Sequence, residues 1–452
     1  MNKLWKFVSG LAIIVLLVSC TPAKTAEPPQ PTNPVSQPTT PAANKAPVTI
    51  SFMRPGLGDD ALKEVQAELK PFNEKYPWIK VEPLIVAPPD LAAKLQTAIA
   101  GGAAPDIVQG ISAGDAVKYS NGNQFLDLTP YAAKDGFDWK SYFNQESLNM
   151  YDQSGKLECI SETSDSSTLA YNKDMFDAAG VAYPNDNWTW DDMLAAAQKL
   201  TKDTNGDGQT DQWGLAIITF DYQPWIWDAG GSLFNSDFSQ IQTTDPVVID
   251  TFQWLADLRF KYKVSPTEDV RKAFPEVGFM FQQNKVAMYV TRWIPDVAFF
   301  FAGIKDFKWD VAMKPKNPKT GKRSSGYAGG CTAVFKNTKN PEEAYLVWKW
   351  LNSDEGVYNR SVANTGTPML PGGPADKWPK LTAAFNDVKI PANAKAFIDM
   401  LPFTRLTELP VATRNEVYAA MDPILDDLWL GKKTAAEVGP LIKQAVDPLL
   451  KK

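Results

Sequence analysis

Oxygen-bearing side chains alternate along one short stretch of the sequence, and their spacing suits a hard cation. A glycine among them, Gly208, permits the sharp turn that such a loop needs. The glutamate that a full helix-loop-helix calcium site carries at its last position is absent, because Gly214 stands there. Asp, Asn and Gly also form turns without a metal. We expect a structural calcium ion, bound more weakly than at a sensor site, on Asp203, Asn205, Asp207, Gln209 through its carbonyl, and Asp211.

Two tryptophans separated by one residue follow this loop, and two glycines come directly after them. Trp225 and Trp227 offer flat apolar ring faces, a platform on which a flat ligand can lie. Gly230 and Gly231 leave backbone amides uncovered. We expect at least one of the indoles to lie in the core. Trp227 is the stronger candidate for a ligand contact, because it leads directly into the glycines.

Composition limits the class of protein. The chain has 452 residues, 44% hydrophobic and 22% charged, which predicts a soluble protein of two domains. A net charge of −6 argues against a nucleic-acid partner. There is no histidine, so the commonest general base and the commonest transition-metal ligand are missing. We expect no required cofactor.

The N-terminus is typical of an exported protein. Lys3 and Lys6 precede an apolar run at 7–18 that is too short to span a membrane comfortably and fits a signal peptide at 1–19. The run Leu-Val-Ser-Cys that ends at Cys20 resembles a bacterial lipobox, so we expect Cys20 to be lipidated. A plain signal peptide with an incidental cysteine is the alternative. Residues 20–46 are rich in Pro, Thr and Ala and predict a flexible tether.

Strands and helices alternate along the folded part, which is the rhythm of a parallel sheet with covering helices. In the first region, strands are expected at 48–53, 79–85 and from 105, with helices from 59 or 60 to 72 and from 91 to 99. In the second region, strands are expected at 167–172 and 285–290, with helices at 173–180, 193–200, from 246 and at 341–351. Thr189 and Asp192 form a variant capping box. The chain from Asp376 is expected to be mostly helical.

Several motifs together resemble the extracellular solute-binding lipoproteins of ABC sugar importers, relatives of maltodextrin-binding protein. Each motif is weak alone, but their order and spacing cover nearly the whole chain. Besides the lipobox they are Pro105-Asp-Ile-Val, Asp165-Ser-Ser-Thr-Leu-Ala-Tyr-Asn-Lys-Asp-Met-Phe, Asp211-Gln-Trp-Gly, Ala229-Gly-Gly, Lys285-Val-Ala-Met and Lys339-Asn-Pro-Glu-Glu-Ala-Tyr. At 158–162, Glu-Cys-Ile-Ser-Glu replaces the Tyr-Gly-Leu-Pro-like run that relatives commonly carry.

The resemblance implies a two-lobed α/β fold of the periplasmic-binding-protein type, each lobe a sheet flanked by helices, with the ligand in a cleft between them. Lobe one would comprise 47–162 and 315–367. Lobe two would comprise 163–314 and 368–452. The sequence alone would suggest two consecutive domains, and the interleaving comes from the resemblance.

Polar and aromatic groups beside strand ends and crossings are the candidates for contact with a sugar, whose hydroxyls need paired donors and acceptors. Asp165 could accept from two vicinal hydroxyls, although a role in bracing the hinge is equally open. Arg292 could instead form a surface ion pair; its position in the family favours ligand contact. The candidates are Arg54, Gly56, Ser112, Asp165, Ser166, Trp225, Trp227, Gly230, Gly231, Arg292, Trp293, Tyr327, Gly329 and Gly330.

Two further cysteines, Cys159 and Cys331, lie in what we expect to be the exported part of the chain. An oxidising compartment allows a disulfide. The sequence does not decide whether the two cysteines meet, so a bonded and an unbonded pair both stay open.

The expected function is capture of a carbohydrate outside the cell and its delivery to the permease subunits of an ABC importer, by a monomer lipid-anchored to the bacterial cell membrane. A surface enzyme acting on polysaccharide is a competing hypothesis, but a glycosidase needs two carboxylates and only Asp165 is evident. A tethered receptor for a sensor kinase would share the fold. A binding protein for a non-sugar solute is a further alternative, in which Arg54 and Arg292 would suit an anion.

Overall fold

The computed structural model describes residues 45–143, 148, 155–161, 163–217, 221–292, 296, 301, 303–327, 330–363, 368–407 and 409–451. The chain divides into two units, Met1–Lys45 and Ala46–Lys452, and apart from Lys45 the described residues belong to the second. The predicted signal peptide, the lipidation site Cys20 and nearly all of the tether lie outside the described residues, as do Trp293 and Gly329.

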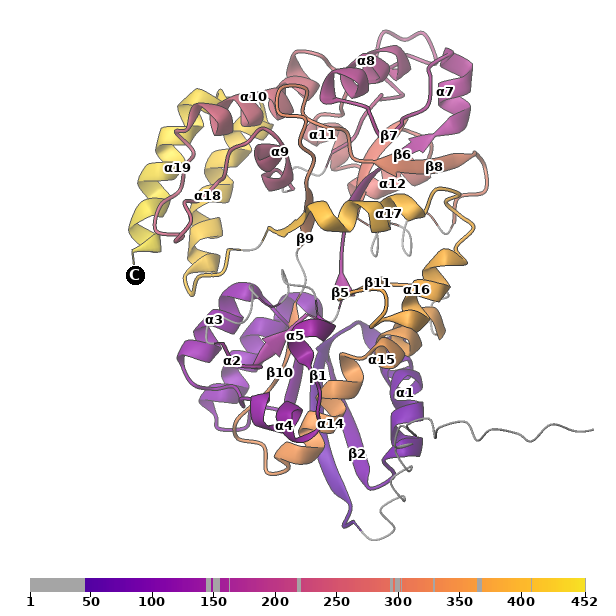
Figure 1. The fold of residues 1–452 in the computed structure, drawn as a ribbon. Coiled ribbons are helices and arrows are strands. Elements are labelled where there is room, and N and C mark those ends of the chain that lie inside the picture. Colours follow the sequence, from indigo (N-terminus) through magenta and orange to yellow (C-terminus); the bar gives the residue numbers. More distant parts are fainter. Residues whose placement is uncertain are drawn as a thin grey trace, which may run out of the picture. The chain divides into compact units, whose positions relative to one another are not determined.

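A five-stranded mixed sheet, in the order β2-β1-β3-β10-β4, forms the centre of lobe one. Three of its strands run parallel: β1 (Val48–Pro55), β2 (Ile79–Val86) and β3 (Ile107–Ile111). The other two, β4 (Cys159–Ile160) and β10 (Cys331–Val334), come from distant parts of the sequence, and β10 is antiparallel to both of its neighbours. The predicted strand–helix alternation of the first region is confirmed (Figure 1).

Alternating side chains of this sheet enter two separate apolar clusters, because successive residues of a strand point to opposite faces. Ile50, Phe52 and Ile107 pack with α1 and α14 on one face. Met53 and Val108 pack with α2 and α3 on the other. The helices of this lobe are α1 (Gly58–Lys75), a 3-10 turn (Pro88–Asp90), α2 (Leu91–Ala100), α3 (Ala113–Asn121), α4 (Thr129–Lys134), α5 (Trp139–Tyr142), α14 (Pro341–Leu351), α15 (Asp354–Tyr358), a π-helical turn (Asn359–Ala363) and α16 (Pro379–Asn386).

A three-stranded sheet forms the centre of lobe two, and it is antiparallel throughout. Its order is β7-β6-β8, with β6 (Ser167–Asn172) between β7 (Met288–Arg292) and β8 (Trp309–Met313). The parallel arrangement that the alternation predicted is therefore wrong for these strands. The central strand β6 runs opposite to both of its neighbours, which come from a much later stretch of the chain, and neighbouring antiparallel strands need no crossover helix between them.

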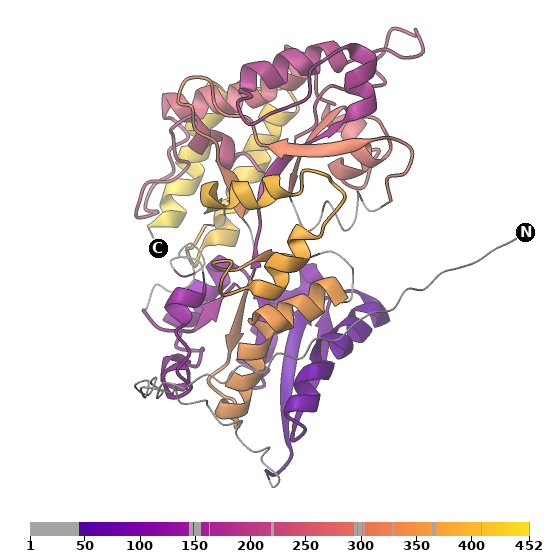
Figure 2. The same ribbon diagram turned by 45° about the vertical axis from the view of Figure 1, so that its right-hand side comes forward.

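Helices cover both faces of this second sheet. Leu169 and Tyr171 enter one apolar cluster and Ala170 the other. The helices are α7 (Lys173–Ala179), α8 (Trp190–Leu200), α9 (Gln223–Asp228), α10 (Pro246–Phe260), α11 (Glu268–Arg271), α12 (Val277–Gln282), α17 (Lys395–Met400), a 3-10 turn (Leu401–Phe403), α18 (Arg414–Trp429) and α19 (Ala435–Leu450). The helix α19 packs against α10 and α18 (Figure 2), and Trp429 of α18 contacts Phe252 of α10.

Local capping explains several of these boundaries. Thr189 and Asp192 form the predicted capping box at the start of α8, each side chain accepting from the other's backbone amide. Asp245 accepts from the amide of Val247 and starts α10, as the sequence indicates. Gly180 ends α7 in a left-handed conformation with φ of 61°. Within the described ranges, no helix combines the length and the apolar character needed to cross a membrane.

Short strand pairs join the two lobes where the chain crosses. β5 (Thr163–Ser164) pairs with β11 (Leu370–Pro371), and β9 (Ser325–Tyr327) pairs with β12 (Thr404–Leu406). The helix α16 also spans both lobes, because Leu381 belongs to an apolar cluster of lobe one and Phe385 to one of lobe two.

Two stretches pack differently from the lobe boundaries that we expected. Residues 316–322 pack on lobe two, where Lys316 exchanges backbone hydrogen bonds with Trp188 and Trp190, so the chain leaves this lobe only after about residue 324. Trp378 and Leu381 lie in the core of lobe one, so the stretch from 368 to about 385 is not part of lobe two alone. Both differences have the same reason. After its last strand in a lobe, the chain still packs on that lobe for some distance before it crosses to the other.

Candidate functional site

Three crossing segments meet at the beginning of the central strand β6. The hydroxyl of Ser166 is fully buried and donates to the carbonyl of Phe397 over 2.9 Å. The backbone carbonyl of Asp165 accepts from the hydroxyl of Thr404, and its carboxylate accepts from the amide of Ser166. The amide of Ser167 donates to the hydroxyl of Ser325. These bonds favour the hinge-bracing role for Asp165 and Ser166, while their contact with a ligand stays a prediction.

The indole of Trp227 lies beneath an arginine. The guanidinium carbon of Arg405, on β12, is 4.7 Å from the centroid of the indole. Trp227 is only 7% exposed, yet the apolar clusters of the described residues do not include it. A cation over an aromatic face is attracted by the ring quadrupole. Arg405 therefore covers the surface that we predicted for a sugar ring, and nothing in the sequence pattern around it pointed to this role.

Trp225 belongs to the core, as we expected of at least one of the two indoles. It is 2% exposed and packs edge-on against Trp190 at 5.3 Å. The reason is that both tryptophans lie on the helix α9 rather than at the end of a strand, which corrects our expectation for Trp227. Side chains two residues apart on a helix point in roughly opposite directions. The two indoles therefore do not form one platform.

A buried ion pair lies next to Trp225. The amine of Lys314 is 2.8 Å from the carboxylate of Asp228, at the end of α9, and 4.1 Å from the centroid of the Trp225 ring. Both charged side chains are almost wholly buried. Burial raises the pKa of Asp228 to about 6, and the charge of Lys314 opposes that rise. Sequence reasoning missed this pair, because the two residues lie far apart in the chain and neither belongs to a motif.

The two glycines after α9 serve the turn and the packing. Gly230 has a φ of 89°, a conformation that other residues rarely adopt. A Cβ on Gly231 would lie 3.0 Å from a methyl of Val247. Both positions thus have a structural reason to be glycine, independent of any ligand.

Arg54, a predicted ligand contact of lobe one, is held by a buried carboxylate. Its guanidinium lies 2.8 Å from Glu68 of α1, and Arg360 lies 3.4 Å from the other oxygen of the same carboxylate. Glu68 is fully buried and Arg54 only 14% exposed. The shared carboxylate ties the end of β1 to the π-helical turn. This arrangement accounts for Arg54 without a ligand, so the use of Arg54 to hold an anionic solute is not favoured.

The other candidates of lobe one lie where strands end. Gly56 follows β1, where a Cβ would approach Ala61 to 2.7 Å. Ser112 caps α3: its hydroxyl accepts from the amide of Asp115 and donates to the Asp115 carboxylate. Gly330 packs directly on the backbone of Gly110. In lobe two, Arg292 ends β7 as predicted and pairs with Ser167, and Tyr327 ends β9 opposite Leu406.

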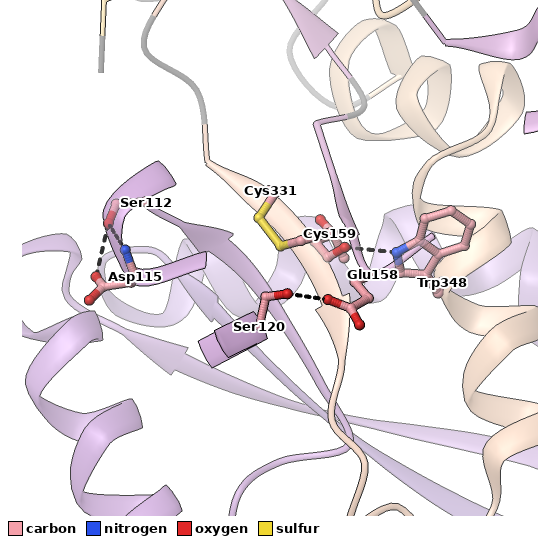
Figure 3. The surroundings of a disulfide bond; sticks show 8 residues. Ser112, Asp115, Ser120, Glu158, Cys159, Cys331 and Trp348 are labelled. Atoms are coloured by element: carbon pink, nitrogen blue, oxygen red, sulfur yellow. Dashed lines mark hydrogen bonds between the residues drawn. A yellow bond between two sulfur atoms is a disulfide. The ribbon is translucent and has the colours of Figure 1, made fainter. Parts of the chain in front are cut away.

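Cys159 and Cys331 form a disulfide in lobe one, which settles the question that the sequence left open. The two Cα atoms are 5.3 Å apart and the residues are 172 positions apart in sequence. Figure 3 shows the bond between β4 and β10, close to Ser112 and the buried carboxylate of Glu158. Cys331 is paired with Ile111, the residue before Ser112. Cys331 is therefore opposite the residue next to Ser112, one of the candidate ligand contacts.

Glu158, where the sequence departs from the resembling family, is buried beside this disulfide. Its carboxylate accepts from the hydroxyl of Ser120 (Figure 3). The amine of Lys156 lies 3.8 Å from the same carboxylate. Glu158, which directly precedes β4, thus connects this strand to the last turn of α3. Its role in the described structure is internal.

The acidic loop is satisfied by its own backbone. Asp203 accepts from the amides of Gly206 and Gly208, and Asp211 accepts from the amide and the hydroxyl of Thr204. These bonds lower the pKa of both carboxyls. Among the described residues, no group of three or more His, Cys, Asp or Glu is arranged to hold a metal ion. The oxygen-rich composition still suits calcium in kind, and calcium binding stays a prediction.

Comparison with known proteins identifies the family. Residues 56–358, more than half of the chain, match the family described as bacterial extracellular solute-binding protein. The arabinooligosaccharide-binding protein of Bacillus subtilis (strain 168) is 28% identical over 298 residues. That alignment covers 61% of this chain and 63% of the relative, so it spans less than two thirds of the relative's length. The sn-glycerol-3-phosphate-binding periplasmic protein of Rhizobium meliloti (strain 1021) is 27% identical over 212 residues, 45% of this chain and 48% of that protein.

A solved structure extends the similarity over nearly the whole folded part. An ABC substrate-binding protein from Listeria monocytogenes, in complex with cycloalternan, superimposes with a TM-score of 0.75 at 25% identity, covering 88% of this chain and 98% of that one. The expected resemblance and the periplasmic-binding-protein-like α/β fold are thus confirmed. The family is one of solute-binding proteins rather than enzymes, so the polysaccharide-acting enzyme is not supported.

Proposed function

Because the chain belongs to the family of bacterial extracellular solute-binding proteins, we propose that it captures a carbohydrate outside the cytoplasm and delivers it to the permease subunits of an ABC importer. The main support for this proposal is the structural similarity to a substrate-binding protein that was solved in complex with cycloalternan. The similarity covers 98% of that protein and 88% of this chain. The relative that binds arabinooligosaccharide points to the same class of ligand. We expect an oligosaccharide rather than a single sugar.

Trp227 is the residue on which we expect the sugar to stack. Its indole lies outside the apolar clusters of the described residues, and the group covering it is the exposed, polar side chain of Arg405. A guanidinium can move aside, or can turn its donors toward hydroxyls at the edge of the same ring. The sugar ring would then take the place of Arg405 on the face of the indole. Binding to both lobes would favour the closed arrangement over the open one.

Substitution of Trp227 tests the proposal. Trp227→Ala removes the stacking surface, and we expect a loss of about 2–4 kcal/mol, or roughly 30- to 1000-fold in affinity. The probes are arabinooligosaccharides, cycloalternan and maltotriose, measured by calorimetry. Arg292→Ala is the second variant. If both variants bind every probe that the wild type binds, and equally tightly, the site lies elsewhere.

Trp225→Ala is the matched control for Trp227→Ala. It removes an indole of the same helix that belongs to the core, so we expect it to lower the stability toward denaturant, whereas Trp227→Ala should leave the fold intact. Small-angle scattering should show the wild type becoming more compact with a probe, and Trp227→Ala doing so only at much higher concentration.

A non-sugar, anionic solute is the second candidate, and one observation favours it. Arg405 is exposed and forms no ion pair with a described residue, so its charge at Trp227 is uncompensated there. One relative is named for binding sn-glycerol-3-phosphate. Binding of glycerol phosphate by the wild type, lost in Arg405→Gln and absent for every neutral oligosaccharide, would establish this candidate instead.

We further propose that Cys20 is diacylated and tethers the folded unit to the bacterial cell membrane through residues 20–46. The short apolar run before Leu-Val-Ser-Cys supports this assignment. The wild type should be found in the membrane fraction and be released from it by detergent. Cys20→Ser should instead be found in the aqueous fraction without detergent. Unchanged partitioning of Cys20→Ser would show that the anchor is not on Cys20.

A further inference from the structure

A pocket of about 230 Å³ lies in lobe two, and none of its lining residues is one that we predicted for the solute. It is formed by the start of α8, one side of α10 and the loop before β9. The residues contributed by α10 recur three or four positions apart, which places them on one face of the helix. The lining residues are Trp190, Asp191, Ala229, Val247, Asp250, Thr251, Trp254, Asn317, Pro318 and Lys319.

Two stacked indoles form the aromatic wall of this pocket. The rings of Trp190 and Trp254 lie 4.5 Å apart at an interplanar angle of 26°. Trp190 is in turn packed against the core residue Trp225. Trp254 is half-buried, whereas Trp190 is only 5% exposed. The wall is therefore held in place by the core and still reaches the pocket, as a surface that stacks on a ligand requires.

Hydrogen-bond donors and acceptors that the described residues leave unused surround this wall. Asn317 is 6% exposed; its carbonyl oxygen accepts from the amides of Lys319 and Thr320, but its amide nitrogen donates to no described residue. The side chains of Asp191, Asp250 and Lys319 are exposed and form no hydrogen bond or ion pair with any described residue. This nitrogen has no described partner and is not among the fully buried side-chain atoms, so it is open to an acceptor supplied from the pocket.

We propose that this pocket is a second carbohydrate site, which takes a single neutral sugar ring. An aromatic wall suits the C–H face of the ring, two carboxylates suit its hydroxyl donors, and Asn317 with Lys319 suit its hydroxyl acceptors. The volume is below the roughly 300 Å³ at which pockets for drug-sized ligands begin, which favours one ring over a chain.

Two other ligand classes fit the pocket less well. A quaternary ammonium would gain from the indoles and the carboxylates, but it would face the amine of Lys319 and leave Asn317 without an acceptor. An anion would face both Asp191 and Asp250. None of the lining residues is among those proposed for the solute, so the pocket would remain a sugar site even if the transported solute proved not to be a sugar.

The test is a titration of the protein labelled with ¹⁵N at its indoles, using D-glucose, D-galactose and L-arabinose as probes. Trp254→Phe identifies the Trp254 indole signal among the 15 tryptophans of the chain. We expect saturable shifts of the Trp254 signal with at least one probe. Asp250→Ala should weaken this binding about tenfold, the size of one charge-assisted hydrogen bond.

Three variants make the assignment specific. Asn317→Asp keeps the oxygen that accepts from Lys319 and Thr320 but removes the amide donor, so it should also weaken binding. Asp269→Ala removes an exposed aspartate outside the pocket and should bind as the wild type does. Trp227→Ala, which affects the proposed solute site, should leave this titration unchanged.

Several results would overturn the proposal. They are the absence of a shift with all three sugars, a shift of equal affinity in Asp250→Ala, and a shift produced by tetramethylammonium but by none of the sugars. Loss of the Trp254 response in Trp227→Ala would show that the signal reports the proposed solute site, and would also count against a separate pocket. Failure of the proposed function would appear instead in the oligosaccharide calorimetry, which does not depend on Asp250.

Discussion

The two lobes hold the crossing segments in different ways. In lobe one, the Cys159–Cys331 disulfide joins a strand that comes shortly before one crossing to the strand that begins just after another. In lobe two, the crossing segments are held by hydrogen bonds, such as those of Ser166 to Phe397 and of Ser167 to Ser325. A covalent bond prevents the segments from separating, whereas hydrogen bonds can exchange. We therefore expect backbone change on ligand binding to concentrate at the lobe-two end of the crossings.

The charged groups of the two lobes show a related difference. Lobe one buries a carboxylate, Glu68, between two arginines, so the charge is shared by three groups. In lobe two, the buried carboxylate of Asp228 is paired with one cation alone, Lys314, and its other oxygen has no hydrogen-bond partner among the described residues. Fewer attractive contacts therefore offset the hydration free energy that the Asp228–Lys314 pair loses on burial. Lobe two should therefore be the more sensitive to the loss of one charged partner.

The largest effect should come from breaking the covalent joint of lobe one. Replacing both cysteines, Cys159→Ser with Cys331→Ser, frees a loop of 172 residues in the unfolded chain. The chain-entropy relation gives a loss of about 5 kcal/mol in the free energy of unfolding. Denaturant unfolding of the oxidised wild type and of the double variant measures it. Hydrogen exchange should show faster opening near residues 159–161 and 330–334, and equal unfolding midpoints would contradict the role given to the disulfide.

Removing one partner of the buried pair in lobe two should cost nearly as much. Lys314→Met leaves Asp228 buried without its cation, and we expect a loss of about 3–5 kcal/mol. The control is Lys314→Met combined with Asp228→Asn, which removes both charges and should recover most of that loss. A double variant no more stable than the single one would show that the packing of Lys314 on Trp225 matters more than the charge.

The same pair should make the stability of the protein depend on pH. The pKa of Asp228 in the folded state, about 6, lies above its ordinary value of 3.8. Between these values the folded state holds the proton more tightly than the unfolded state. The contribution of Asp228 is therefore complete below about pH 4 and is lost as the pH rises through about 6. Unfolding curves at a series of pH values should show this fall in the wild type but not in the double variant without charges.

The sequence predicted local features of the fold better than long-range ones. The capping box of Thr189 and Asp192, the start of α10 at Pro246 and the bounds of α14 were confirmed, because each depends on residues within one or two helical turns. The antiparallel sheet of lobe two and the course of residues 316–322 were not predicted. They depend on which distant segments meet, and no local pattern encodes that choice.

The candidate site shows the same limit. Trp227 and Trp225 were singled out by type and spacing, but the contrast between them follows from their lying on a helix, where two residues apart means opposite sides. Arg405 and Lys314, which cover the two rings, are both far away in sequence. Aromatic pairs can be found by pattern, whereas the cation that covers each ring can be found only from the fold.

Calcium binding by the acidic loop is a smaller expected effect and belongs to lobe two alone. A metal that binds only the folded state stabilises it by about 1.4 kcal/mol when its concentration is ten times the dissociation constant. Chelation should lower the melting temperature of the wild type and leave oligosaccharide affinity nearly unchanged. Asp207→Ala should melt like the chelated wild type and gain nothing from added calcium. Superimposable melting curves with calcium and with chelator would show that the backbone hydrogen bonds of the loop suffice.

The smallest effect separates the structural from the ligand-binding role of Ser112. As the cap of α3, Ser112 satisfies the amide of Asp115, and Ser112→Ala should cost about 1 kcal/mol of stability. Thr189→Ala removes a cap of the same kind in lobe two, away from the crossings, and should cost about as much. If Ser112 also contacts the solute, as its place at the end of β3 predicts, only Ser112→Ala will weaken binding of the oligosaccharide probes. Equal affinity in the two variants would leave Ser112 a cap alone, and the contribution of lobe one to the site would then have to come from other residues.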